Sequence, residues 1–353
     1  MSASHASSAP SSSGTHEGGV CSSRRLHPSI LVVIGMVAIA LAVIASVSLG
    51  AREVSLSEIL GGIFGSSQDL GAIAVRERLP RTVIALVVGA ALSLAGVLMQ
   101  SLTRNPVADP GILGINMGAS LAIVMGIAFL GLSSLWQYLW LALAGAILTA
   151  LFVQAVGSAG PGGQTPVKLA LAGVATSAAL SSVVSAILLP RAQIMEDFRF
   201  WQVGSLGRGT WETLGTIAPF LIIGALAALI ISSPLDSLAL GEEMAIGLGV
   251  NVPLTRAVAA LSGVLLCAAS TAVAGPIGFV GLMIPHVIRL LIGPSHLWLM
   301  ILSSIGGATL LTFSDVIGRI LLEQGEVPVG VITAFIGAPI LILIARSAKV
   351  RTL

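Results

Sequence analysis

Residues 80–103 read PRTVIALVVGAALSLAGVLMQSLT, and Arg81 is the one charged residue in this run. A helix needs about 20 mainly apolar residues to cross the hydrocarbon core of a bilayer, and this run is long enough. Glycine and alanine are frequent in it, and small residues let membrane helices pack closely. The stretch therefore predicts a transmembrane helix, and the rest of the chain repeats its pattern.

The composition of the whole chain points to lipid as its main solvent. The protein has 353 residues, of which 56% are hydrophobic and 9% are charged, and its mean hydropathy is +1.03. A soluble domain carries about 25% charged residues because its surface faces water. The formal net charge of +2 gives no indication of a nucleic-acid partner. Cys21 and Cys267 form no disulfide framework and no metal-ligand spacing.

Ten apolar runs of about membrane length follow one another along the chain. They lie near 29–50, 80–103, 111–132, 135–156, 166–190, 214–234, 254–275, 277–293, 296–317 and 328–346. Residues 1–27 are rich in Ser, Gly and Ala without apolar periodicity, which predicts a disordered cytoplasmic tail. The predicted organisation is this tail, a ten-helix transmembrane domain over 28–347, and a short cytoplasmic end at 348–353.

Basic residues at the two ends of the chain suggest its orientation. An even number of spans places both termini on one side, and Arg24, Arg25, Arg346, Lys349 and Arg351 flank the first and last spans. The positive-inside rule then predicts cytoplasmic termini. A short echo between 81–89 and 256–263 is consistent with an inverted repeat of the kind that builds transporters. Chance similarity between glycine-rich apolar runs explains it equally well.

The chain shows none of the common signatures of catalysis. It lacks a Gly-Lys-Ser/Thr phosphate loop, a His-Glu-x-x-His zinc motif and a Gly-x-Ser-x-Gly nucleophile elbow. All fifteen acidic residues can be placed at or near an interface, Asp315 with the least certainty, which disfavours an ion-coupled carrier with an acid at mid-membrane. The sequence therefore predicts a protein that is not an enzyme and does not itself hydrolyse ATP.

The loop over 238–250 reads LALGEEMAIGLGV and is amphipathic, with an acidic polar face at Glu242 and Glu243. One interpretation is an interfacial helix lying on lipid. A polar face without Lys or Arg suits an anionic leaflet poorly, so a short helix that docks into the groove of a partner protein fits better.

Five segments resemble the hallmarks of the FecCD/BtuC-type permeases, which belong to binding-protein-dependent importers of iron-siderophores, haem and cobalamin. They are RLPR at 78–81, NPVADPGILG at 105–114, LGEEMAIGLG at 240–249, GPIGFVGLMIPH at 275–286 and EVPVGVITAFIGAP at 326–339. The resemblance covers roughly residues 50–346. It implies an all-α integral membrane protein with the architecture of a type II ABC importer permease.

This resemblance assigns a role to each end of the protein. A coupling loop over 235–252 would seat on an ATPase subunit, through Gly241, Glu242, Glu243, Ala245, Leu248 and Gly249. Arg78, Arg81 and Arg319 would receive acidic residues of a substrate-binding protein. The alternative is that these arginines only snorkel at the interface. Docking is favoured because the sequence shows no internal acidic partner for this basic ring.

The resemblance also indicates residues along the pathway. Asn105, Pro106 and Val107 match part of a cytoplasmic gate, and Thr165 and Pro166 occupy the position of the other gate. The sequence GPGGQTP at 160–166 departs from the family pattern, so the gate residues there stay open. Candidates for lining the outer mouth are Phe198, Phe200, Trp201 and Gln202, which could equally form an aromatic belt at the outer interface.

The expected function is that of a permease subunit in the cell membrane that passes an iron(III)-siderophore into the cytoplasm. Haem or cobalamin are alternative cargoes, and an ion-coupled secondary transporter is the alternative class; a multispan channel or scaffold is a further one. The expected partners are a second permease subunit, two ATP-binding subunits, a periplasmic or lipid-anchored substrate-binding protein and the bilayer, with no nucleic acid. No cofactor is expected on this chain, since ATP and Mg²⁺ would be used by the partner ATPase.

Overall fold

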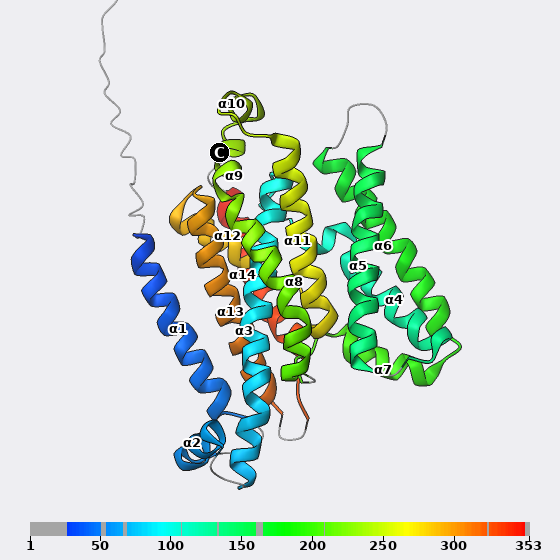
Figure 1. The fold of residues 1–353 in the computed structure, drawn as a ribbon, viewed down its shortest axis with the longest axis vertical. Coiled ribbons are helices and arrows are strands. Elements are labelled where there is room, and N and C mark those ends of the chain that lie inside the picture. Colours follow the sequence, from blue (N-terminus) through cyan, green and yellow to red (C-terminus); the bar gives the residue numbers. More distant parts are fainter. Residues whose placement is uncertain are drawn as a thin grey trace, which may run out of the picture.

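A computed structural model describes residues 27–50, 54–65, 69–106, 108–132, 134–159, 165–207, 209–322 and 325–349. Every regular element in these ranges is a helix, which confirms the all-α fold class. Most of the long helices run side by side along the long axis of the molecule (Figure 1). The tail predicted for residues 1–27 lies outside the described residues, apart from His27.

Each of the ten predicted spans corresponds to one helix. These are α1 (Pro28–Ser48), α3 (Leu70–Thr103), α4 (Ile115–Leu130), α5 (Leu135–Ser158), α6 (Pro166–Leu188), α8 (Trp211–Ile230), α11 (Val252–Ala274), α12 (Val280–Ile292), α13 (His296–Ile320) and α14 (Val329–Lys349). Within the described residues, seven are long and apolar enough to cross a membrane, while α4, α12 and 329–343 are shorter apolar helices. At a rise of 1.5 Å per residue, α12 spans only about 20 Å.

Five short helices connect the spans. They are α2 (Leu56–Phe64), the 3₁₀ helix η1 (Pro110–Leu113), α7 (Ala192–Gln202), α9 (Ser232–Ala239) and α10 (Glu242–Gly247). The α9–α10 pair confirms that residues 235–252 form short helices rather than one long one. Gly241 separates them with a φ of 122°, a backbone conformation that favours glycine.

The start of the second span was predicted wrongly. Its helix, α3, begins at Leu70 rather than near residue 80, so Arg78 and Arg81 lie inside the helix. Pro80, where the apolar run begins, is an interior residue of α3. The eighth span was also predicted too long, because α12 begins only after Gly275 and Phe279 adopt positive φ angles of 71° and 69°.

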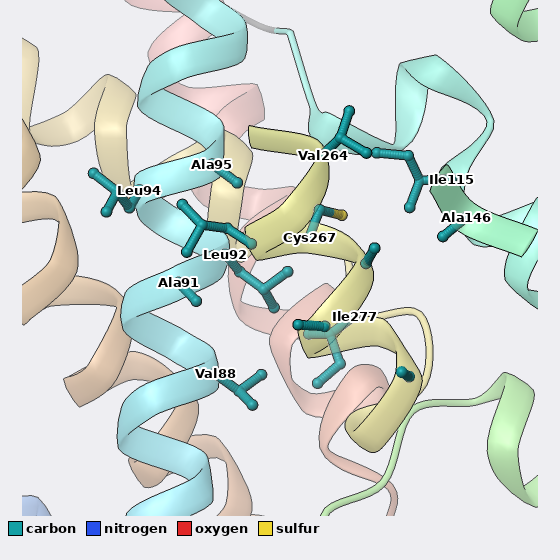
Figure 2. Close-up of a cluster of buried hydrophobic side chains, with 14 of the residues drawn as sticks. Val88, Ala91, Leu92, Leu94, Ala95, Ile115, Ala146, Val264, Cys267 and Ile277 are labelled. Carbon is teal, nitrogen blue, oxygen red and sulfur yellow. The ribbon is translucent and has the colours of Figure 1, made fainter. Parts of the chain in front are cut away.

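Helix α3 lies at the centre of the core. Val88, Leu92 and Ala95 face a cluster that includes Val264 and Cys267 of α11 (Figure 2). Helices α12 and α13 also pack against α3. Backbones approach closely there, because a Cβ atom added to Gly96 would collide with the backbone oxygen of Gly281. Small residues at this contact thus let the backbones of α3 and α12 pack directly against each other.

The two ends of the bundle differ in the elements that they hold. One end holds α10, the start of α1 and the described end of α14, and the opposite end holds α2 and α7 (Figure 1). We call them the α10 end and the α2 end. Both described termini of the chain therefore lie at the same end, as an even number of spans requires.

Candidate functional site

At the α2 end, Arg81 binds two carboxylates. Its Nε and Nη2 atoms donate to the buried Asp315 of α13, with Nη2 2.8 Å from Oδ1. Its Nη1 atom lies 2.8 Å from Oε2 of Glu326, which is 42% exposed. Arg319 approaches the same Asp315 from one helical turn away, at 3.1 Å. Asp315 is thus shared by two guanidinium groups and is only 2% exposed.

Arg78 and Arg319 complete the hydrogen bonds at the carboxyl-terminal end of α1. The last carbonyls of a helix have no partner within it. Here Arg319 Nη1 donates to Ser46 O at 3.0 Å, and Arg78 Nη1 donates to Val47 O at 3.0 Å and to Ser48 O at 3.2 Å. Cations are also favoured near this negative end of the helix dipole. These two arginines therefore hold α1 against α3 and α13.

The structure corrects the premise on which docking by these arginines was favoured. The cluster does have internal acids, Asp315 and Glu326, and Arg78 and Arg319 are buried rather than exposed. The pairing of Asp315 with Arg319 could have been predicted from the sequence, because residues four apart lie on one face of a helix. Glu326 lies in the loop before α14, and no sequence spacing relates it to Arg81. Arg81 pairs with the exposed carboxylate of Glu326.

At the α10 end, the coupling loop presents an apolar and acidic surface. Met244, Ile246 and Leu248 are all exposed, and Glu242 and Glu243 occupy the first turn of α10. Glu242 pairs with Arg256 of α11 at 2.8 Å, although both side chains are partly exposed. Ala245 is the buried residue of α10 itself. Exposed apolar side chains on a short loop helix are typical of an interaction surface.

A second cluster at the α10 end was missed by the sequence analysis. His296, the first residue of α13, is 3% exposed, and its Nδ1 atom lies 2.7 Å from Oδ1 of Asp236 in α9. The backbone N–H of His296 donates to the same oxygen at 2.8 Å. Its Nε2 atom and the hydroxyl of Ser101 in α3 share a hydrogen bond of 2.9 Å. The three residues are far apart in sequence, so no local spacing reveals them.

The predicted gate residues fall around two cavities at this end. A cavity of about 250 Å³ is lined by residues that include Thr103, Arg104 and Thr165. Pro106 lines a second cavity of about 410 Å³ beside α9. The end of α3 and the start of α6 therefore meet at one cavity, as two gate segments would. Asn105 is exposed, Val107 lies outside the described residues, and so does the side chain of Pro166.

The loop after α3 holds a partly buried carboxyl group. Asp109 accepts a hydrogen bond from the backbone N–H of Gly111 at 2.7 Å and thereby caps η1. Burial raises the pKa of Asp109 above its ordinary value, although the hydrogen bond from Gly111 opposes this rise. Nearby, Asn116 Oδ1 accepts from the hydroxyl of Thr271 in α11 at 3.1 Å.

The candidates for the outer mouth lie on α7 at the α2 end. Phe198 is 1% exposed and packs in the core, with its ring centroid 5.8 Å from that of Trp201. Its side chain therefore lines no open surface in this structure. Gln202 is exposed and Trp201 is half-buried. The side chain of Phe200 lies outside the described residues.

Long apolar helices with charged residues gathered at both ends of the bundle are typical of a multi-pass membrane protein. The FecCD transport family model matches residues 38–347, and the chain belongs to this family. It is 43% identical over 331 residues to the ferric enterobactin transport system permease protein FepD of Escherichia coli (strain K12), covering 93% of this chain and 97% of that protein.

Other relatives and a solved structure are similar to this chain over most of its length. The chain is 42% identical to the Fe(3+)-citrate import system permease protein YfmD of Bacillus subtilis (strain 168), covering 86% of this chain and 90% of that protein. It is 33% identical to the hemin transport system permease protein HmuU of Yersinia pestis, covering 93% and 99%. The inward-facing structure of a metal-chelate type ABC transporter superposes with a TM-score of 0.78 at 30% identity, covering 91% of this chain and all of that one.

Proposed function

We propose that this chain is the membrane-spanning permease subunit of an ABC importer that moves an iron(III)-siderophore complex into the cytoplasm. The observation that carries the proposal is the 43% identity, over 93% of the chain, to a ferric enterobactin permease. A ferric citrate permease follows at 42%. A hemin permease is 33% identical, so haem is the second candidate cargo.

The α10 end would face the cytoplasm and the ATPase subunits. The surface of α10 combines exposed Met244, Ile246 and Leu248 with the acidic Glu242 and Glu243. An amphipathic helix of this kind binds by placing its apolar side chains in a groove of a partner. ATP and Mg²⁺ would be used there by two ATP-binding subunits, because the chain has no phosphate-binding loop of its own.

The α2 end would face the substrate-binding protein. Among the three candidate arginines, Arg81 is suited to this contact, because its Nη1 atom pairs with the partly exposed Glu326. A carboxylate of the binding protein could take the place of Glu326 while Asp315 keeps the guanidinium in position. Arg78 and Arg319 would act indirectly, by fixing α1 and α13 around Arg81.

The pathway would form when this subunit pairs with a second permease subunit. Helices α6 and α14 carry exposed apolar side chains, including Val174 and Phe335, which are suited to lipid or to such a partner. Movement of the α10 end by the ATPase would open one gate and close the other. The cavity that Arg104 and Thr165 share lies where the cytoplasmic gate would close.

Uptake into proteoliposomes tests this proposal. The permease would be reconstituted with its ATPase and binding protein, and radioactive iron bound to enterobactin or supplied as haemin would be offered in separate arms. We expect ATP-dependent accumulation of ferric enterobactin. Accumulation of haemin alone would overturn the siderophore assignment. Uptake by the permease alone under an imposed ion gradient would overturn the importer class.

A further inference from the structure

Three helices meet in one polar cluster, centred on a buried histidine, at the α10 end. Asp236 belongs to α9, His296 begins α13, and Ser101 lies in the last turn of α3. Both ring nitrogens of His296 are engaged, at 2.7 Å from Asp236 and 2.9 Å from Ser101. The ring is only 3% exposed, whereas Asp236 is 42% exposed. We call Asp236, His296 and Ser101 the α9 joint.

Arg104 adds a second connection between α3 and α9. Its Nη2 atom donates to Leu238 O at 3.4 Å, close to the end of α9. The residue caps α3 in a left-handed conformation with a φ of 50°. A residue other than glycine rarely adopts this conformation, and it is held there only when the surroundings stabilise it. Polar contacts thus attach α9 to the end of α3 at two places.

The cavity of about 410 Å³ lies beside these contacts, between α9 and the ends of α3 and α12. Leu235 and Leu238 of α9 line one side of it, and Gln100 and Arg289 line the other. Apolar packing therefore does not fill this space. Helix α9 therefore has room to shift on this side. It also packs against α8, α11 and α13, and the α9 joint adds hydrogen bonds that connect it through His296 to α3.

Helices α3 and α13 extend from the α9 joint to the Arg81 cluster. Ser101 and Arg81 are both in α3, about 30 Å apart at 1.5 Å per residue. His296 and Asp315 are both in α13. The two helices pack closely at Gly89 and Gly307, where an added Cβ atom would collide with the facing backbone. Helices α3 and α13 are therefore suited to moving together as a rigid body.

We infer that the α9 joint is the mechanical connection through which movement of α9 and α10 reaches the α3–α13 pair and, through it, the Arg81 cluster. The inference rests on the proposed function, in which α10 contacts the ATPase and Arg81 contacts the binding protein. Asp236, His296 and Ser101 are positioning residues in this scheme. They contact no cargo, and their hydrogen bonds convert a shift of the coupling loop into a shift of two spans.

The experiment measures ATP hydrolysed per ferric enterobactin transported, in the reconstituted complex of permease, ATPase and binding protein. In Asp236→Ala and His296→Ala, we expect this ratio to rise about five-fold or more, the lower end of the usual range of coupling between sites. Stimulation of hydrolysis by the binding protein should be lost in the same variants. Asp236→Asn keeps an acceptor oxygen for His296, so its ratio should stay near that of the unaltered protein.

His286→Ala is the matched histidine control, because Nδ1 of His286 has no hydrogen-bond partner among the described residues. A purely structural defect would lower hydrolysis and transport together and leave the ratio unchanged. If His296→Ala does not purify, Asp236→Ala gives the decisive value, since Asp236 is 42% exposed. An unchanged ratio in Asp236→Ala would overturn the inference. Absence of ATP-dependent transport in the unaltered complex would instead overturn the proposed function.

Discussion

Arg319, near the end of α13, donates a hydrogen bond of 3.0 Å to the backbone oxygen of Ser46, near the end of α1. The same guanidinium lies 3.1 Å from Asp315 and therefore connects two helices to the charged cluster at the α2 end. The first span packs along α13 and also contacts α3, and its buried residues are Ala42, Ser46 and Val47. The hydrogen bonds of Arg319 and Arg78 add polar contacts at its carboxyl-terminal end.

Arg319→Ala should lower the stability of the protein markedly. Ser46 O would lose its donor, and leaving a buried acceptor unsatisfied costs about 1–3 kcal/mol. Among the described residues, Asp315 would keep only Arg81 as its charged partner. The apparent melting temperature in detergent measures this effect. Arg199→Ala is the matched control, because Arg199 is exposed on α7. Equal melting temperatures for the two variants would contradict a structural role for Arg319.

Glu326→Gln should strengthen association with the binding protein at low salt. The amide no longer neutralises Nη1 of Arg81, while Asp315 still holds the guanidinium in place. Rim charges act mainly on the association rate, so the gain should appear there and shrink as salt screens the charges. Surface plasmon resonance at two salt concentrations tests this. Glu77→Gln, an exposed acid elsewhere in α3, is the control.

The double substitution Glu242→Arg and Glu243→Arg should weaken co-purification of the ATPase subunit. It reverses the charge of the first turn of α10 and also removes the pair between Glu242 and Arg256. That pair is largely exposed, so its loss alone should cost at most about 1 kcal/mol. Arg256→Ala removes the pair without reversing charge and serves as the control. Full ATPase recovery with the double variant would exclude this acidic turn from the interface.

Gly96→Ala should destabilise the core, because the new methyl group would collide with the backbone of Gly281. Overpacking of this kind costs about 1–3 kcal/mol. Gly215→Ala in α8 is the matched control, since an added Cβ atom there meets nothing within 4 Å. The control should melt at the same temperature as the unaltered protein or slightly higher. A Gly96→Ala protein as stable as the control would show that α3 and α12 can separate freely.

Asp109→Asn should change how stability depends on pH. Because burial raises the pKa of Asp109 in the folded protein, this carboxyl group stabilises the fold when protonated. That contribution is present below its ordinary pKa and is lost as pH rises through the raised value. The amide keeps an acceptor for Gly111 and does not titrate. The variant should therefore gain melting temperature relative to the unaltered protein at pH 7, and this gain should shrink toward pH 4. A difference independent of pH would contradict the shifted pKa.

The sequence alone was enough to locate the spans. Each of the ten apolar runs corresponds to one helix, and the acidic loop contains α9 and α10 as expected. Transfer into lipid depends on the side chains of one segment, so a window of about 20 residues contains most of the information. The helix boundaries were predicted less well. The second apolar run was placed at 80–103, whereas α3 begins at Leu70 and Pro80 lies inside it.

The composition, the apolar runs and the family motifs were decided by the sequence itself, because burial in lipid and helix formation act on neighbouring residues. The partners of the charged groups were decided only by the tertiary structure. Arg81 and Asp315 are 234 positions apart, and His296 and Asp236 are 60 apart. Whether an arginine is free to bind another protein depends on which helices pack beside it, and that is settled only when the whole bundle has assembled.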